Sequence, residues 1–363
     1  MEKAINLLKQ IEAMQSAGNR FFPAGLFPVW RKSPLHLKAR PDPDFFLTAS
    51  VLFTLDNIIA CLDHKGSAHL PEVEAISDRI RIQAYQAYPL FRNAHPDGTL
   101  TYNFWPRKPG MHFPFGLIFR HLQSIAIPDD IDDTALAFLT MPHTPAEAQL
   151  VQNKLQFHAN KYRKTNTTAL SFYRNEPIPN TWFGSKMLIE FDVCALLNLL
   201  HMCSRYGLPW DDRTAAALRF VRSVLLHSEH FNYPFISSPY YAEAGIILYH
   251  YARFAAEFPG VLGADCLQKI ENDCRHILSA DYPEGSRLMA YISLSRLGLY
   301  AERPSVDEDA FISGFSFSVA GWLSAFEGKR IRRLAEKPFL QFRFFCPAFS
   351  LALLAEAEVY AVK

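Results

Sequence analysis

The chain has 363 residues, enough for one large domain or two ordinary ones. Lysine and arginine total 37 against 36 aspartates and glutamates, with no basic run or stripe, which argues against a nucleic-acid partner. Aromatic residues make up 14% of the chain, including 30 phenylalanines, so we expect an aromatic-rich core or an aromatic-lined cavity for an apolar or cationic ligand.

Helical periodicity predominates along the chain. The predicted helices cover residues 2–17, 44–63, 71–88, 130–141, 145–162, 187–206, 211–227, 239–257, 264–280, 286–300, 315–326 and 347–362. Extended structure is expected only at residues 99–105, 181–183 and 339–345, and residues 19–43 and 93–128 are expected to be long loops. Gly18, Gly207 and Gly298 are placed to end helices.

About a dozen consecutive helices with few strands predict an all-α fold, which we expect to form a single domain over residues 1–363. An open solenoid should have a repeat of fixed period, and none is found. We therefore favour an (α/α)6 barrel, a double ring of helical hairpins, which places loops and helix N-termini at the mouth of a central cavity.

The compartment is expected to be the cytoplasm. The N-terminal segment is amphipathic and lacks the continuous apolar stretch of a signal peptide. No window reaches the roughly 18 apolar residues of a membrane span, so no transmembrane segment is predicted. The six cysteines form no CxxC pair, which is typical of reduced, buried thiols.

The most informative segment lies at residues 129–133, where four aspartates follow Pro128 and precede an apolar run. So many like charges are tolerated at a helix N-terminus, where free N–H groups and the helix dipole offset their repulsion. If the segment faces solvent, it is only an acidic helix start. If it is buried, like charge and desolvation raise the carboxyl pKa values, and the cluster can serve as a general acid.

Residues 130–135 read Asp-Ile-Asp-Asp-Thr-Ala, which matches the DxDDTA signature of squalene–hopene cyclases and other class II terpene cyclases. The resemblance implies an (α/α)6 barrel in which Asp132 protonates a terminal alkene or epoxide of an isoprenoid. Asp130 and Asp133 would tune this acid and hold its geometry, and Thr134 would support the turn. Because the chain is too short for the second helical domain of most such enzymes, we expect a prenyl chain shorter than squalene.

The same resemblance implies an aromatic pocket for the carbocation, and we expect it to be lined by Phe104, Trp105, Trp182, Tyr240 and Tyr241. Residues 97–99 together with Trp105 resemble the Gly–Trp repeats of those cyclases. Residues 233–241 are similar to an aromatic segment of small bacterial proteins related to single-barrel terpene cyclases. The ligand would be a small apolar molecule or a prenyl diphosphate. Protonation needs no metal or other cofactor, and Mg²⁺ enters only if the substrate carries a diphosphate.

Metal-dependent alternatives remain open. Residues 129–133 also satisfy the DDxxD motif of class I terpene synthases, whose carboxylates bind Mg²⁺ and a diphosphate. The downstream Asn272-Asp273 lacks the Ser and Glu of the partner metal motif. Asp192 and Cys194 resemble the Asp-x-Cys zinc ligands of protein prenyltransferases, with His250 or His276 as the third ligand.

In one further alternative other carboxylates are catalytic, and in another the protein catalyses no reaction. Carboxylates paired at a barrel mouth occur in (α/α)6 glycoside hydrolases, and the candidates here are Glu190 and Asp192, with Asn198 and His201 downstream, together with Asp42, Asp44 and Asp56. The barrel could also bind an isoprenoid or another apolar ligand without catalysis. The environment of Asp132 separates these cases: an apolar cavity, bulk solvent or a metal shell. The oligomeric state is not predicted.

Overall fold

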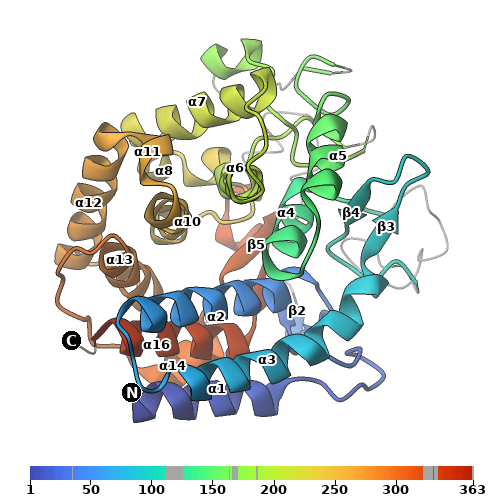
Figure 1. Ribbon diagram of the computed structural model, residues 1–363. Coiled ribbons are helices and arrows are strands. Elements are labelled where there is room, and N and C mark those ends of the chain that lie inside the picture. Colours follow the sequence, from blue (N-terminus) through green and yellow to red (C-terminus); the bar gives the residue numbers. More distant parts are fainter. Residues whose placement is uncertain are drawn as a thin grey trace.

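Six helices that are buried on nearly every side form a closed cycle of contacts in the computed structural model (Figure 1). The structure describes residues 1–34, 36–108, 110, 126–162, 164–165, 171–184, 187–321, 330 and 334–361. The six helices, each in contact with the next and the last with the first, are α2 (Phe46–His64), α4 (Ile131–Thr140), α6 (Val193–Arg205), α10 (Ala244–Glu257), α13 (Glu284–Arg296) and α16 (Pro347–Ala361). A helix that is apolar all round is stable only when other elements cover it, and this cycle provides the cover.

Amphipathic helices pack against the outside of these six and alternate with them along the chain. They are α1 (Glu2–Met14), α3 (Leu70–Ala87), α5 (Pro145–Leu155), α7 (Asp212–Leu226), α12 (Ala264–Ser279) and α14 (Glu308–Gly314). In α12 the buried residues Cys266, Ile270, Cys274 and Ile277 follow helical spacing and form one apolar stripe. The described residues are therefore mostly helical, as predicted.

Short helical segments occupy the connections. They are α8 (Glu229–Asn232), α9 (Pro234–Ser237), α11 (Pro259–Leu262) and the 3-10 turns η1 (Tyr88–Leu90), η3 (Ser171–Asn175) and η4 (Pro338–Leu340). Gly207 and Gly298 end α6 and α13 with φ angles of +62° and +73°, as their positions predicted.

Strands are more extensive than the sequence predicted. An antiparallel sheet has the order β2 (His36–Pro41), β1 (Trp30–Ser33), β6 (Gln341–Phe345), β5 (Ser318–Gly321), and β3 (Arg92–Ala94) forms a hairpin with β4 (Leu100–Tyr102). The predicted extended segments at 99–105 and 339–345 contain β4 and β6. The loop predicted at 19–43 was wrong in part, because β1 pairs with β6, about three hundred residues away, and local sequence carries no signal for such pairing.

The helix predicted at 315–326 was also wrong. Ser318–Gly321 forms β5, which pairs with β6, and the helix α14 lies earlier; residues 322–326 lie outside the described part of the chain. Two other helices begin later than predicted, at Val193 and Ala244, and the helix predicted to reach residue 162 ends at Leu155. The residues that were predicted to begin these two helices, α6 and α10, form loops instead, and these loops line the site described below.

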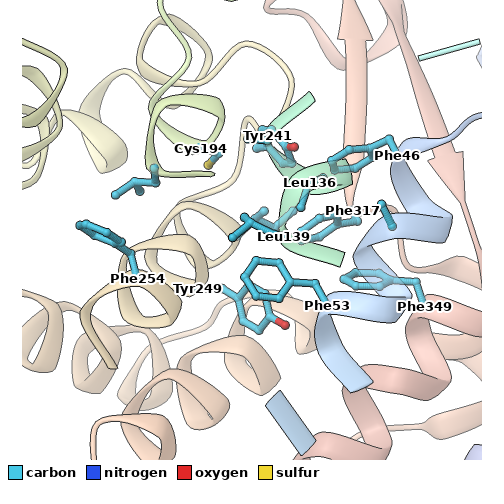
Figure 2. Packing of buried hydrophobic residues seen from close by; sticks show 14 of the residues in the cluster. Phe46, Phe53, Leu136, Leu139, Cys194, Tyr241, Tyr249, Phe254, Phe317 and Phe349 are labelled. Carbon is cyan, nitrogen blue, oxygen red and sulfur yellow. The ribbon is translucent and has the colours of Figure 1, made fainter. Parts of the chain in front are cut away.

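Apolar side chains from several inner helices point toward one another in the interior (Figure 2). The labelled members of this cluster are Phe46, Phe53, Leu136, Leu139, Cys194, Tyr241, Tyr249, Phe254, Phe317 and Phe349. The cluster extends from Ala4 to Val359, so both ends of the described chain contribute to it. All six cysteines are free, and five are buried, as predicted for reduced thiols.

Only α2, among the described helices, is long and apolar enough to cross a membrane. Within that stretch 67% of the residues are buried inside the protein. Length and composition of this kind are also typical of a core helix, and α2 contacts α3, α4 and α16.

Candidate functional site

A cavity of about 250 Å³ lies at the N-terminal ends of α2, α4, α6 and α10. Residues of β5 and Phe344 of β6 form part of its wall. The eight residues predicted for a cyclase-like site all line this cavity: Phe104, Trp105, Asp130, Asp132, Asp133, Trp182, Tyr240 and Tyr241. These residues come from four separate stretches of the chain, and the fold brings them together.

The acidic turn is the first turn of α4. Asp130 is the N-cap of this helix: its backbone is extended, and its Oδ1 accepts a hydrogen bond from the Asp133 amide at 2.7 Å. The turn does not face solvent, because Asp130, Asp132 and Asp133 are 5%, 9% and 2% exposed. The reading of these aspartates as a solvated helix start was therefore wrong, since the surrounding loops and the sheet cover the end of the helix.

Two extended segments hold the turn from either side. The Asp130 amide donates to the Tyr102 carbonyl at 3.2 Å, and the Ile131 amide donates to the Thr181 carbonyl at 2.8 Å. The Thr134 hydroxyl accepts a hydrogen bond from the Tyr102 amide at 3.0 Å. The backbone of the turn is thus fixed by β4 on one side and by the loop before α6 on the other.

Both carboxylate oxygens of Asp132 accept hydrogen bonds from buried donors. Asn198 Nδ2 donates to Oδ1 at 2.6 Å, and the Tyr241 hydroxyl donates to Oδ2. Burial raises the pKa of Asp132, while Tyr241, Asn198 and the positive charge of Arg253 oppose that rise. Asp132 therefore lies in an apolar cavity with donors that stabilise its anion.

Asp130 and Asp133 lack a comparable cation. Burial raises the pKa of Asp130 to about 8, and burial together with the charge of Asp130 raises the pKa of Asp133 well above its usual range. Asp133 Oδ1 is buried and has no hydrogen-bond partner among the described residues. Asp132 is therefore the carboxyl of the three whose anion the site stabilises most.

Two other acids support the aromatic walls. Glu190 Oε2 accepts hydrogen bonds from the Tyr240 hydroxyl at 2.5 Å and from Trp182 Nε1 at 3.3 Å. The rings of Trp182 and Tyr240 meet edge to face, with their centroids 5.7 Å apart. Asp42 Oδ1 accepts a hydrogen bond from Trp105 Nε1 at 2.6 Å. Glu190 and Asp42, both candidates for glycoside hydrolysis, are engaged in holding aromatic side chains.

Asp192 is the N-cap of α6. Its Oδ1 accepts hydrogen bonds from the Cys194 amide at 2.8 Å and from the Ser238 hydroxyl at 2.7 Å, and its Oδ2 accepts one from the Tyr240 amide at 3.1 Å. His250 Nδ1 lies 2.9 Å from the Ile246 carbonyl of its own helix. No group of three or more His, Cys, Asp or Glu side chains that could hold a metal ion is found within the described ranges. Those residues therefore do not assemble the zinc ligand set that the Asp-x-Cys pair suggested.

Asp129 faces the β3–β4 hairpin rather than the cavity. Its Oδ2 accepts hydrogen bonds from Thr101 Oγ1 at 2.5 Å and Asn93 Nδ2 at 3.0 Å, and its Oδ1 accepts one from Asn103 Nδ2 at 3.2 Å. Because Asp129 is directed away from Asp133, the two end aspartates of the DDxxD reading do not face a common point. The Asp97-Gly98-Thr99 stretch forms the turn of the same hairpin, and Gly98 has a φ of +83°.

Sequence reasoning missed two of the three groups on which Asp132 depends. Asn198 was considered only as part of a glycoside hydrolase, and Arg253 was not considered at all. The available signal was a lone arginine within the apolar run of α10, where it is 5% exposed. A buried arginine needs a partner, and that partner can be sought among the acids.

No protein-family model matches the sequence, and no curated protein gives a significant match.

Proposed function

We propose that the chain is a class II terpene-cyclase-like enzyme that starts the cyclisation of an isoprenoid by proton transfer from Asp132. The observation that carries this proposal is the position of Asp132, which lines an apolar cavity and has a hydrogen-bond donor on each carboxylate oxygen. An unperturbed aspartate, with a pKa of about 3.9, would be ionised at neutral pH and could not donate a proton. Burial raises the pKa of Asp132, which is the direction that a proton donor requires.

The scaffold of this enzyme is an (α/α)6 barrel. Six inner helices contact one another in a closed cycle, and each is preceded in the chain by a helix that packs outside the cycle, with short helical segments in some connections. The cavity lies at the N-terminal ends of four inner helices, which is where such a barrel has its mouth. A hydrophobic cluster that runs from α1 to α16 supports a single domain.

The chemistry is an addition of a proton followed by an intramolecular attack. The Oδ2–H of Asp132 protonates one alkene carbon, whose π electrons form the new C–H bond, and the other alkene carbon becomes a cation. A second double bond of the same molecule attacks this cation and closes a ring. Loss of a proton to a carboxylate or water completes an isomerisation in which atoms and charge balance.

Aromatic side chains would stabilise the cationic intermediate. Trp105, Trp182, Tyr240 and Tyr241 line the same cavity as Asp132. Their ring faces carry negative partial charge and attract cations, most strongly when water is excluded. Three carboxyl groups at one end and aromatic walls elsewhere suit a substrate whose positive charge develops after binding.

The size of the cavity favours a short isoprenoid. A cavity of roughly 150 Å³ holds one benzene molecule. In the same proportion, the volume here, about 250 Å³, corresponds to an isoprenoid of about ten carbons rather than thirty. The substrate is therefore a short prenyl alcohol or a prenyl diphosphate, with Mg²⁺ bound to the diphosphate in the second case.

Product analysis tests the proposal. The purified protein is incubated with geranyl, farnesyl and geranylgeranyl substrates, as alcohols and as diphosphates, with and without Mg²⁺, and products are identified by gas chromatography and mass spectrometry. We expect a cyclic isomer from the wild type and none from Asp132→Asn. Equal product formation by the two proteins would remove the general-acid role. Tight binding of a substrate without turnover would instead favour the non-catalytic alternative, in which the barrel only holds an apolar ligand.

A further inference from the structure

A buried arginine on α10 contacts the candidate acid through a single amide. Arg253 Nη2 donates a hydrogen bond to Asn198 Oδ1, and Asn198 Nδ2 donates to Asp132 Oδ1 at 2.6 Å. The three side chains come from α10, α6 and α4, which are three different members of the inner cycle. All three are buried, so solvent does not screen the interaction.

The arginine determines how the amide of Asn198 is oriented. A guanidinium group can only donate hydrogen bonds, so it requires the oxygen of the amide. The NH₂ group of Asn198 must then face Asp132, where it can only donate. Asp132 Oδ1 is therefore an acceptor, and a proton on this carboxyl resides on Oδ2, because the Tyr241 hydroxyl beside Oδ2 can accept a hydrogen bond as well as donate one.

The surroundings of Arg253 keep its charge close to this chain of hydrogen bonds. Its guanidinium lies over the Phe53 ring at 4.1 Å and over the Tyr249 ring at 5.9 Å. Burial lowers the pKa of Arg253 to about 10, which leaves it charged at neutral pH. A fixed positive charge that is separated from Asp132 by a single amide group stabilises the anion of Asp132 more than its neutral form.

We propose that Arg253 is a positioning residue, which acts through Asn198 to strengthen Asp132 as an acid and to keep its proton on Oδ2. The inference rests on the proposed role of Asp132 as the proton donor. A strong acid is what protonation of an alkene demands, and burial alone would make Asp132 a weak one. The relay through Asn198 supplies the opposing effect without a direct ion pair that would keep Asp132 permanently ionised.

Several other titratable groups surround Asp132 and have to be considered in any pH experiment. They are Asp130 and Asp133 on α4, Asp192 and Cys194 at the start of α6, and Tyr241 before α10; Asp44 acts on Asp133, and His250 contacts the Tyr241 ring. Burial lowers the pKa of His250 well below its usual value, so this side chain is neutral. None of these groups is altered in the variants below, so a change in the titration of Asp132 is attributable to the relay.

The test is a direct titration of Asp132 in the intact protein, without any substrate. Aspartate labelled with ¹³C at the side-chain carboxyl is incorporated, and the resonance of Asp132 is identified by its loss in Asp132→Asn. In Arg253→Met we expect the titration midpoint of Asp132 to rise by about one to two pH units. Arg253→Lys keeps the charge and one donor, so its midpoint should lie between those of Arg253→Met and the wild type.

The matched control is Arg205→Met. Arg205 lies over the same Phe53 ring, at 5.4 Å, but its hydrogen bonds go to Glu257, to His201 and to the Leu139 carbonyl rather than to Asn198. Its removal takes a second cation from the Phe53 ring and leaves the relay in place. The midpoint of Asp132 should therefore stay at the wild-type value in this variant.

An unchanged midpoint in folded Arg253→Met would overturn the proposal. If that variant does not fold, Arg253→Gln removes the charge and keeps an NH₂ donor for the Asn198 oxygen, and the same rise in the midpoint or its absence decides. The titration and the turnover assay fail independently. A shifted midpoint without turnover supports the relay and removes the cyclase proposal. Turnover with an unshifted midpoint supports the cyclase proposal and removes the relay.

Discussion

Two buried carboxyl groups of the inner helices differ in how they meet an arginine. Glu356 on α16 pairs directly with Arg296 on α13, with an N–O distance of 2.6 Å, and both side chains are almost completely buried. Asp132 on α4 meets Arg253 only through the amide of Asn198. The first pair lies within the packed core, and the second carboxyl lines the cavity.

The Glu356–Arg296 pair is arranged for stability, whereas the surroundings of Asp132 are arranged for proton transfer. Burial disfavours the charged forms of both groups, yet the Glu356 carboxylate raises the pKa of Arg296 above its usual value, and Arg296 opposes the rise that burial causes in the pKa of Glu356, so direct contact favours the ionised pair. An intervening amide weakens the interaction between Arg253 and Asp132, and Asp132 can then exist with or without its proton. A carboxyl group that donates and recovers protons needs the second arrangement.

The largest expected effect comes from replacing the carboxylate of Asp132 by an amide in Asp132→Asn. We expect turnover of an isoprenoid to fall by about 10²- to 10⁴-fold, the range typical of a lost general acid. The midpoint of thermal unfolding should change little, because an amide has nearly the same shape and still accepts one of the two hydrogen bonds. Steady-state kinetics and calorimetry measure the two effects. A large loss of stability with full activity would reverse the roles assigned to the two sites.

Glu356→Gln should have the opposite signature. Loss of the charge leaves Arg296 buried without its anion, which costs about 3–5 kcal/mol of the free energy of unfolding. Chemical denaturation measures this cost. The control is Glu358→Gln on the same helix, where the pair with Arg303 at 2.6 Å is partly exposed and the expected loss is about 1 kcal/mol or less. Equal losses in the two variants would contradict the distinction.

The close approach of α10 and α13 determines where the arginines of these helices sit. A Cβ atom at Gly245 would lie 2.6 Å from Ser286 Cα, which is closer than real contacts. Gly245→Ala should therefore destabilise the protein by about 1–3 kcal/mol, as measured by denaturant unfolding. Gly260→Ala is the control, since no atom lies within 4 Å of its added Cβ. A neutral effect at Gly245 would mean that the two helices separate without cost.

The pH dependence of stability provides the most specific test. The pKa of Asp130 is about 8 in the folded protein and about 3.9 in an unfolded chain, so the folded state binds the proton more tightly. The contribution of Asp130 to stability is complete below about pH 4 and is lost as the pH rises to about 8. Asp130→Asn keeps the helix cap and should reduce this decline, measured by urea unfolding at pH 5 and pH 8.

The control for this measurement is Asp97→Asn. Asp97 is exposed, and its pKa is lowered by the hydrogen bond from the Thr99 amide, so it titrates below pH 4 and contributes nothing between pH 5 and pH 8. An identical decline in wild type and Asp130→Asn would show that Asp130 does not hold its proton in the folded protein.

Local sequence patterns predicted the elements whose signals are local. The turn at Asp130 was recognised because a cap, acidic charges and an apolar run are adjacent in the chain. The starts of α6 and α10 were placed too early, because the apolar residues before Asp192 and Ala244 continue the helical periodicity although they line a cavity. The strand β5 was taken for helix, because its pairing partner lies outside any local window.

The amino-acid sequence by itself determined the mostly helical fold, the acidic turn at the start of α4 and the aromatic residues near it, since each depends on the spacing of neighbouring residues. Tertiary structure decided that the turn is buried, that Asn198 and Tyr241 contact Asp132, and that β5 and β6 line the cavity. The physical reason is range: periodicity and capping act within a few residues, whereas burial and hydrogen bonds between helices depend on segments that only the folded chain brings together.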